Sequence, residues 1–280
     1  MKQIYLYFDT CVLNKLAYIK NYNYICNKFK ENNIIICVSE INILEILRDT
    51  NDRTNIDKII TMLQEFNEIL YVLPSVKSII FKFLKKEKMI FNLSDSNIVI
   101  NDVLNDKNLE FKIENTQTLN KLKDFYKLFK NLIKKDTNFR CKVCNEEYCS
   151  GKINNASYTF AYLLMSYDIF FLDNIDINDL WKKLNVHSNE ELEKYIYKNY
   201  DYLINNDLSP FRQIGKMAVL QKKVSNGTFN DCVQIIYNSF VDYFISDDSH
   251  FINNLNNCLT FDDFLRQINI KVFYYNSIRY

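Results

Sequence analysis

The amino-acid sequence predicts an α/β protein with a mainly parallel central sheet and an inserted helical subdomain. Near both ends of the chain, short apolar runs rich in Ile, Tyr and Phe alternate with amphipathic helical patterns. The run IIICV at 34–38 is entirely apolar, which is typical of a parallel strand covered on both faces. The segment 76–204 instead carries long, Lys-rich helical patterns. We therefore expect a sheet-containing domain that is interrupted by helices.

The first half of the sheet domain is predicted from its hydrophobic periodicity. Residues 3–8 have the pattern of a buried strand, and apolar positions recur at helical spacing over 12–30. After the second strand, Ser39 is placed to cap a helix. The pattern then predicts a helix near 54–67 and a further strand over 68–73.

The α/β pattern resumes after the helical segment. A helix opening at Asp231 leads into a strand over 242–246. Thr260 is placed to cap a short helix, and a last strand is expected over 270–275. The expected domain limits are residues 1–75 and 205–280 for the discontinuous sheet domain and residues 76–204 for the helical insertion.

Composition narrows the class of protein. Hydrophobic residues make up 48% of the 280 residues, enough for a packed core, and three Gly and two Pro leave little room for disordered linkers. A net charge of +1 excludes a uniformly basic nucleic-acid coat. The first apolar run is too short for a signal peptide and is broken by Asp9. We therefore expect a soluble, cytoplasmic protein with reduced cysteines and no membrane partner.

Five acids lie beside apolar runs rather than in solvated stretches, and they are Asp9, Glu45, Asp231, Asp247 and Asp248. The carboxyl ends of parallel strands meet at one edge of a sheet, so we expect these acids to converge there. Crowded carboxylates repel one another unless a divalent cation neutralises them, and Mg²⁺ or Mn²⁺ prefers oxygen ligands. Such a site suits phosphodiester hydrolysis, because a bound ion lowers the pKa of an attacking water.

Each acid also has a structural interpretation. Asp9 and Asp231 could be helix N-caps, which is the commoner role for either residue considered alone. Glu45 could pair with Arg48, three residues further along the helix. The acidic pair at 247–248 could form a solvated turn. Considered together, the five acids favour a shared site, because each of them accompanies a buried segment.

At these residues the sequence resembles the PIN-domain ribonucleases. The resemblance rests on YFDTCVLNKL at 7–16, on VSEINILEIL at 38–47 and on NDCVQIIYNSFVDYFISDDSHF at 230–251. It implies a three-layer α/β/α sandwich around a parallel sheet, with endoribonuclease activity, and it covers roughly residues 1–72 and 205–280.

The resemblance also implies the roles of individual residues. It implies that Asp9, Glu45, Asp231 and Asp248 are the catalytic, metal-binding acids. Ser246 would be the small hydroxyl residue before the last acid, and Phe251 the aromatic residue after it. The spacing leaves Asp247 and Asp248 as alternatives for that last position, so both are expected metal ligands.

The sequence thus predicts a metal-dependent endoribonuclease that hydrolyses RNA with water activated by carboxylate-bound Mg²⁺ or Mn²⁺. The insertion would select the RNA or bind an inhibitory or activating protein partner, and analogy with the family suggests a toxin or a phage-defence effector. Two alternatives stay open. One is a catalytically inactive PIN-like scaffold that binds RNA or protein, and the other is a DNA nuclease that uses the same acids.

The segment RCKVCNEEYCSGK carries Cys141, Cys144 and Cys149. A C-x2-C pair lets two thiolates bind one zinc ion, and a structural zinc site needs four ligands. His187 or a distant cysteine would have to supply the fourth ligand. The cluster predicts a structural Zn²⁺ in the insertion, while three reduced cysteines without metal explain the pattern equally well.

A basic segment precedes this cluster. From Lys121 to Lys142, eight basic residues stand against two aspartates, with aromatic residues interleaved. The aromatics could stack on single-stranded bases while the lysines meet phosphates. An amphipathic helix with solvated lysines is the alternative interpretation. Arg212 and Lys216, which precede Asp231 in the sequence, could likewise guide a phosphate backbone or simply be solvated.

Overall fold

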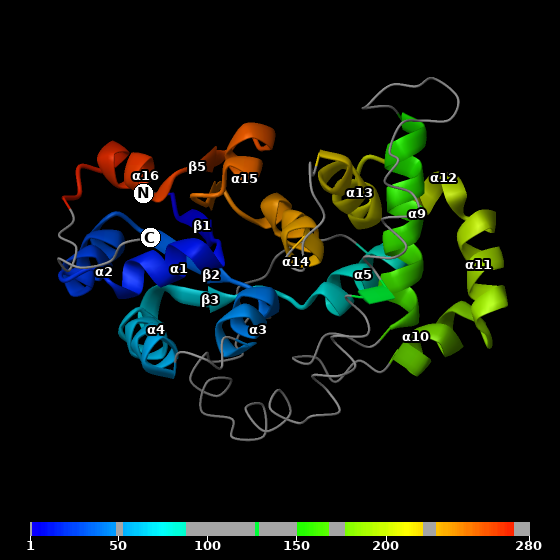
Figure 1. Cartoon of the computed structure of the whole chain (residues 1–280), viewed down its shortest axis with the longest axis horizontal. Coiled ribbons are helices and arrows are strands. Elements are labelled where there is room, and N and C mark those ends of the chain that lie inside the picture. The colour runs from blue at the N-terminus through cyan, green and yellow to red at the C-terminus, as the bar shows by residue number, and fades with distance from the viewer. Residues whose placement is uncertain are drawn as a thin grey trace. The chain divides into compact units, whose positions relative to one another are not determined.

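The computed structural model describes residues 2–48, 53–87, 127–128, 150–167, 177–220 and 228–271 (Figure 1). These residues fall into two compact units. The first unit takes in the described residues up to Pro74 and from Tyr237 onward, and the second takes in those between Ser75 and Ile236. The first break lies between Pro74 and Ser75. The second break lies between Ile236 and Tyr237, so residues 205–236 are grouped with the helices of the second unit.

The first unit contains an all-parallel sheet of five strands, as the sequence predicted for the α/β class. The order across the sheet is β3-β2-β1-β4-β5. The strands are β1 (Ile4–Phe8), β2 (Ile34–Val38), β3 (Leu70–Val72), β4 (Tyr243–Ile245) and β5 (Cys258–Leu259). In the register, Tyr7 of β1 lies between Cys37 of β2 and Phe244 of β4.

Helices connect these strands in the first unit. They are α1 (Thr10–Ala17), α2 (Tyr22–Glu31), α3 (Glu40–Arg48), α4 (Arg53–Glu65), α15 (Ser249–Asn254) and α16 (Phe261–Gln267), with the 3-10 helix η1 (Asn67–Ile69). A second 3-10 helix, η3 (Ile235–Phe240), belongs to the first unit from Tyr237 onward. Along the chain, β2 and β3 add to one side of β1, whereas β4 and β5 add to the other. The direction of strand addition therefore reverses between β1 and β4, which is the position where open parallel sheets form their ligand crevice.

Both faces of the sheet are covered by aromatic side chains. Tyr7 and Phe8 are neighbours in a strand, so they point to opposite faces. The ring of Tyr7 stacks on Tyr237 of η3 with centroids 5.5 Å apart. The ring of Phe8 meets Phe29 of α2 at 6.3 Å and Phe261 of α16 at 5.8 Å. This burial of both faces is compatible with a three-layer sandwich.

The described residues of the second unit are helical. They form α5 (Val76–Leu84), α9 (Ser150–Ser166), α10 (Ile177–Leu184), α11 (Asn189–Lys198), α12 (Tyr200–Leu203), α13 (Pro210–Leu220) and α14 (Thr228–Gln234). Helices α9 and α13 pack closely at Gly215, where an added Cβ would lie 2.2 Å from Ser157 Oγ. This contact needs glycine, because a side chain would overlap the serine.

Several predicted elements differ in extent from the observed ones. The helical pattern over 12–30 forms two helices, because α1 closes in a tight turn in which Ile19 N donates to Leu16 O at 3.0 Å. Helix α14 begins at Thr228, so Asp231 lies inside it rather than at its opening. The two-residue strand β5 was not predicted, since it is too short for a periodic signal. Most of the strand expected over 270–275 lies outside the described residues.

Candidate active site

Asp9 lies at the carboxyl end of β1, directly before α1. Its N–H donates to Ile245 O of β4 at 3.0 Å, which fixes Asp9 at the β1–β4 junction. Its Oδ1 accepts a hydrogen bond from Thr10 N at 2.6 Å, so the residue caps α1, as the structural interpretation predicted. Asp9 is only 7% exposed, so the cap leaves the rest of its carboxylate in a buried setting.

The other oxygen of Asp9 is bound by two side chains. Asp9 Oδ2 accepts from Ser246 Oγ at 2.7 Å and from Cys11 Sγ at 3.2 Å. Ser246 Oγ in turn accepts from Asp248 N at 3.0 Å, and Cys11 Sγ accepts from Asp247 N at 3.5 Å. Ser246 and Cys11 therefore connect Asp9 to the acidic pair that follows β4.

Glu45 joins the same network from α3. Thr10 Oγ1 donates to Glu45 Oε2 at 2.5 Å, while Thr10 N donates to Asp9. One threonine therefore binds the carboxylates of two different elements. Glu45 is half-buried, and the side chain of Arg48, its alternative partner, lies outside the described residues.

Asp247 is held by a cation. Its Oδ2 lies 3.0 Å from Lys15 Nζ, and its Oδ1 accepts from Phe261 N at 3.2 Å. Lys15 also pairs with Asp262 at 2.8 Å, and the lysine side chain is only 16% exposed. Lys15 thus ties α1 to the segment after β4 and to α16.

Asp248 has a different environment. Its Oδ1 accepts from His250 N at 2.7 Å, so Asp248 is the N-cap of α15. Among the described residues, no ion pair involves its carboxylate. The two acids that the sequence could not separate are therefore distinguished by structure, because Asp247 pairs with a lysine and Asp248 caps a helix.

The electrostatics of this cluster follow from burial and like charge. Burial raises the pKa of Asp9 above its ordinary value, although the hydrogen bonds from Ser246, Cys11 and Thr10 oppose this and the charge of Asp248 adds to it. The pKa of Cys258 is raised to about 12, first by burial and then by the charge of Asp9. The site is thus a region of negative potential at the sheet edge.

Asp231 belongs to the second unit. It lies in the first turn of α14 and is half-buried, while the other six residues of that helix are buried. Carboxylates seldom lie in buried segments unless they are paired or bind a ligand. The position of Asp231 is therefore consistent with a functional carboxylate. That Asp231 joins the acids of the first unit stays a prediction.

The predicted zinc cluster of Cys141, Cys144 and Cys149 lies outside the described residues, as does nearly all of the basic segment. His187 is described, and its backbone N–H donates to Glu191 Oε2 at 2.7 Å. Within the described ranges, no three His, Cys, Asp or Glu side chains stand in an arrangement that could hold a metal ion as it is. The carboxylates of the cluster are joined through the intervening hydrogen-bond donors. Over the same ranges, no helix is long and apolar enough to cross a membrane.

The second unit has its own cation cluster and a small pocket. Asp207 Oδ1 pairs with Arg212 Nε at 2.9 Å and with Lys216 Nζ at 2.7 Å, so both cations have a local structural partner.

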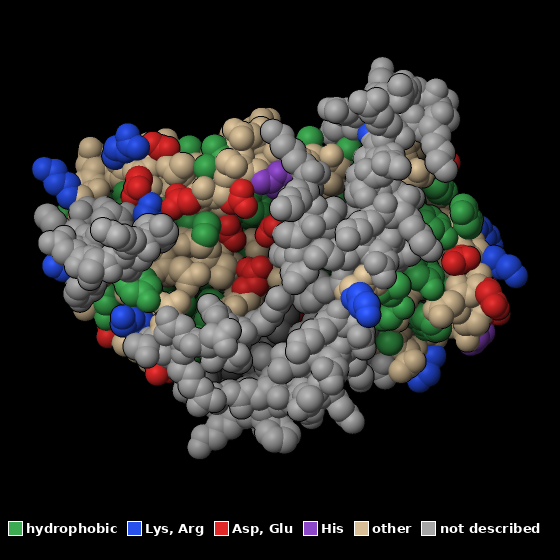
Figure 2. Space-filling model, in the orientation of Figure 1, with side chains coloured by type: hydrophobic (Ala, Val, Ile, Leu, Met, Phe, Trp, Pro, Cys, Tyr) green, Lys and Arg blue, Asp and Glu red, His purple; other side chains and the backbone are tan. Residues whose placement is uncertain are grey.

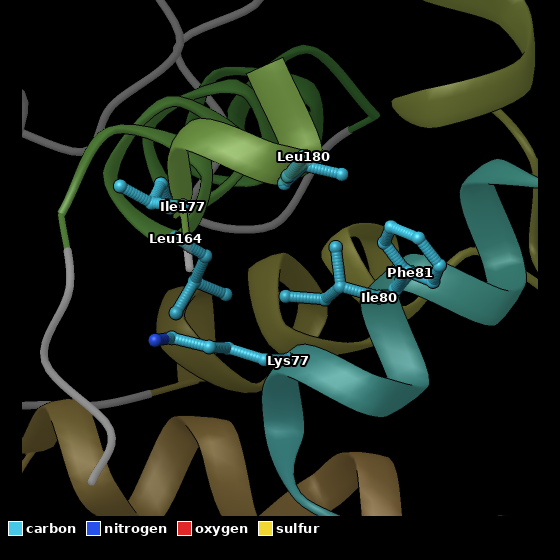
Figure 3. A pocket seen from close by; sticks show the side chains of 6 residues that line it. All are labelled: Lys77, Ile80, Phe81, Leu164, Ile177 and Leu180. Carbon is cyan, nitrogen blue, oxygen red and sulfur yellow. The ribbon is translucent and has the colours of Figure 1, made fainter. Parts of the chain in front are cut away.

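A mainly apolar pocket lies between α5, α9 and α10 (Figure 3), and none of the predicted acids lines it. Its lining consists of Lys77, Ile80, Phe81, Leu164, Ile177 and Leu180.

Two side chains of the acidic cluster, Lys15 and Asn42, were not predicted from the sequence. Lys15 was not singled out, although it stands in α1 between the buried Leu13 and Leu16, a position that favours a specific partner for a lysine. Asn42 was also missed, and its amide donates to Thr10 Oγ1 at 3.1 Å. A polar residue buried in an apolar helix pattern was the available signal.

The topology explains why the cluster forms where it does. Asp9 follows β1 and Ser246–Asp248 follow β4, the two strands between which the order of strand addition reverses. Figure 2 shows acidic side chains gathered over β1.

Comparison of the chain with protein-family models, curated proteins and solved structures found no match.

Proposed function

We propose that this protein is a metal-dependent endoribonuclease of the PIN type. The observation that carries the proposal is the convergence on Asp9. Thr10 connects this buried carboxylate to Glu45, Cys11 connects it to Asp247, and Ser246 connects it to Asp248. The network brings four of the five predicted acids to the crevice position of a parallel sheet. The fifth, Asp231, is proposed to join them from α14.

The donor set fits a hard divalent cation. Asp9 accepts three hydrogen bonds and donates none, which is the behaviour of an ionised carboxylate. Burial opposes that charge, as the raised pKa shows, so a cation nearby would stabilise it. Mg²⁺ or Mn²⁺ would be held by Asp9, Glu45, Asp231 and Asp248. When bound, it would supply charge neutralisation and lower the pKa of the attacking water.

The chain's own residues orient these acids. Ser246 and Thr10 hold both oxygens of Asp9 in place, so the carboxylate cannot rotate without losing a bond. Lys15 neutralises Asp247 and leaves Asp248 as the better ligand of the pair. The network therefore supports Asp248, rather than Asp247, as the last metal-binding acid. No side-chain nucleophile is needed, because water attacks the phosphorus.

The second unit is proposed to select the RNA or to bind an inhibitory or activating protein partner. A structural Zn²⁺ at Cys141, Cys144 and Cys149 would stabilise it. Roles as a toxin or as a phage-defence effector rest on analogy with PIN-domain ribonucleases alone.

A second candidate function is a catalytically inactive PIN-like scaffold. It is favoured by the ion pair between Lys15 and Asp247 and by the capping roles of Asp9 and Asp248, because a structural role already accounts for each of these carboxylates. The two candidates differ in one measurable property, since a scaffold has no need to bind a divalent cation at Asp9.

The deciding experiment is cleavage of pooled cellular RNA by the purified full-length protein with Mn²⁺ or Mg²⁺. Matched reactions contain EDTA, the Asp9→Asn protein and the Asp242→Asn protein as a control acid of the same unit that binds Lys2 away from the cluster. Metal-dependent fragments that vanish in Asp9→Asn and persist in Asp242→Asn support the proposal. Wild type and Asp9→Asn that are equally inert, with equal Mn²⁺ binding, would favour the scaffold.

The choice between RNA and DNA needs a separate competition. Only RNA offers the 2′-OH, so an RNA-specific site should ignore a DNA of the same sequence. Efficient cleavage of single-stranded DNA at the same metal concentration would instead identify a DNA nuclease that uses the same acids.

A further inference from the structure

A chain of four hydrogen bonds runs from the core of the first unit to Glu45. Tyr7 Oη lies 2.8 Å from Ser39 Oγ, and Ser39 Oγ lies 3.1 Å from Asn42 Oδ1. Asn42 Nδ2 lies 3.1 Å from Thr10 Oγ1, which lies 2.5 Å from Glu45 Oε2. Tyr7, Ser39 and Asn42 are completely buried, so the chain begins beneath the site and ends at it.

The direction of every bond in this chain is fixed by chemistry. Ser39 N can only donate, and it lies 2.7 Å from the Asn42 side chain, so the atom there must be the acceptor Oδ1. Asn42 Nδ2 then faces Thr10 and donates to its hydroxyl. The single proton of Thr10 is therefore available for Glu45 Oε2. Since the Ser39 proton is given to Asn42, Tyr7 must donate to Ser39.

The chain spans several elements that the fold brings together. Tyr7 belongs to β1 and Ser39 follows β2, while Asn42 and Glu45 are one turn apart on α3. Thr10 is the first residue of α1. Breaking one link leaves a buried polar group without its partner, which is costly, so the chain resists rearrangement. The orientation of Glu45 is consequently coupled to the core of the sheet.

We infer that Tyr7, Ser39, Asn42 and Thr10 are positioning residues that fix the Glu45 carboxylate for the divalent cation. Because Thr10 donates to Oε2, this oxygen is held as an acceptor and the carboxylate has one preferred orientation. Partners that orient a metal ligand are typically worth about 10–100-fold in metal affinity or activity. The inference rests on the proposed function, in which Glu45 binds the cation.

The test is calorimetric titration of Mn²⁺ alone into the full-length protein, without RNA. Thr10→Val keeps the shape of the side chain and removes the hydroxyl, so Mn²⁺ should bind about 10–100-fold more weakly. Thr10→Ser keeps the hydroxyl and should restore binding. Thr61→Val is the matched control, because this exposed threonine only donates to Asp57 O in α4.

Milder variants keep the test valid if Thr10→Val does not fold. Tyr7→Phe and Ser39→Ala each remove hydrogen bonds at the end of the network that is farthest from Glu45. Each should therefore weaken Mn²⁺ binding less than Thr10→Val does. Tyr237→Phe is the control for the tyrosine, since its ring stacks on Tyr7 outside the chain of four bonds. Circular dichroism and urea unfolding report whether each variant is folded.

A double-mutant cycle separates positioning from a general loss of packing. If Thr10 acts through Glu45, Thr10→Val should weaken Mn²⁺ binding in the wild-type background and add nothing in the Glu45→Gln background. Equal losses in both backgrounds would overturn the inference, because the threonine would then act independently of the glutamate.

The outcomes also separate this inference from the proposed function. If Glu45→Gln weakens Mn²⁺ binding while folded Thr10→Val, Ser39→Ala and Tyr7→Phe bind as wild type does, the positioning chain is wrong and the metal site stands. If Asp9→Asn and wild type bind Mn²⁺ equally and neither cleaves RNA, the proposed function fails and the inference fails with it.

Discussion

The two sides of the acidic cluster are held together by different chemistry. On the side of α3, Asp9 and Glu45 are bound by neutral donors, Thr10 and Ser246. On the side of α16, Asp247 and Asp262 share the cation Lys15. Neutral donors orient a carboxylate and leave its charge in place, whereas a lysine cancels charge. The difference indicates which acids remain available to a divalent cation.

The largest expected effect on RNA cleavage comes from substituting the two acids after β4 one at a time. Asp248→Asn should lower RNA cleavage by more than about 100-fold, because a metal ligand loses its charge. Asp247→Asn should lower it by less than about 10-fold, since Lys15 already neutralises this acid. Initial rates at saturating Mn²⁺, with calorimetric Mn²⁺ titrations beside them, measure both variants.

These two variants are matched in their effect on folding. Asn is as good an N-cap as Asp, so Asp248→Asn should keep α15 intact. In Asp247→Asn, the new amide oxygen can still accept from Phe261 N. Equal losses of activity, or a larger loss in Asp247→Asn, would show that the lysine pair does not separate the two acids.

The next effect concerns the cation itself. Lys15→Met keeps the aliphatic stem and removes the charge that Asp247 and Asp262 share, so it should destabilise the protein by about 2 kcal/mol. The same change should tighten Mn²⁺ binding, because a neighbouring positive charge is gone. Urea unfolding and metal titration measure the two effects on one sample.

Lys2→Met is the control for that prediction. Lys2 pairs with Asp242 at 3.1 Å, but its side chain is 84% exposed, so the pair should contribute less than about 0.5 kcal/mol. The prediction fails if Lys15→Met is as stable as Lys2→Met and binds Mn²⁺ as wild type does. Lys15 would then neither stabilise the fold nor oppose the binding of a cation.

Local signals in the sequence were sufficient for strands β1 to β4, for the cap at Thr260 and for the acids at the ends of β1 and β4. The apolar runs at β1 and β2 and the capping residue Thr260 act over a few neighbouring residues, so periodicity and cap chemistry reveal them. Placing Asp9 and Asp248 in one cluster needed only the rule that parallel strands end at a common edge.

The missed features depend on partners that are distant in the sequence. Lys15 and Asp247 are separated by 232 positions, and Asn42 reaches Thr10 over 32. No local pattern encodes such a pairing, since it exists only once β1, β2 and β4 are adjacent. The grouping of residues 205–236 with the second unit has the same origin, because helix packing between α13 and α14 cannot be seen from periodicity.

A smaller effect tests the buried charge of Asp9. Burial raises the folded-state pKa of Asp9 above 3.8, so its favourable contribution to stability is complete below pH 3.8 and is lost as the pH rises through the folded pKa. In EDTA, the unfolding free energy of wild type minus that of Asp9→Asn should therefore be largest in acid and decline toward neutral pH. Urea unfolding of both proteins between about pH 3 and pH 8 measures it.

Manganese should change that pH dependence. With Mn²⁺ at a saturating concentration, the carboxylate gains a cationic partner, so the difference between wild type and Asp9→Asn should instead grow toward neutral pH. A difference that stays constant with pH in both conditions would show that Asp9 carries no buried charge and is a cap alone.

The smallest expected effect is chemical and concerns Cys11. Its thiol is exposed, but burial of part of the group and the charge of Asp9 raise its pKa well above the usual range. Little thiolate is present at neutral pH, so iodoacetamide should modify Cys11 several-fold more slowly than free cysteine, as peptide mapping by mass spectrometry would show. Asp9→Asn should speed the reaction, because it removes the negative charge that helps to raise the pKa of Cys11. Alkylation of Cys11 at the rate of free cysteine would contradict the prediction. It would mean that burial and the charge of Asp9 do not raise the pKa of this thiol.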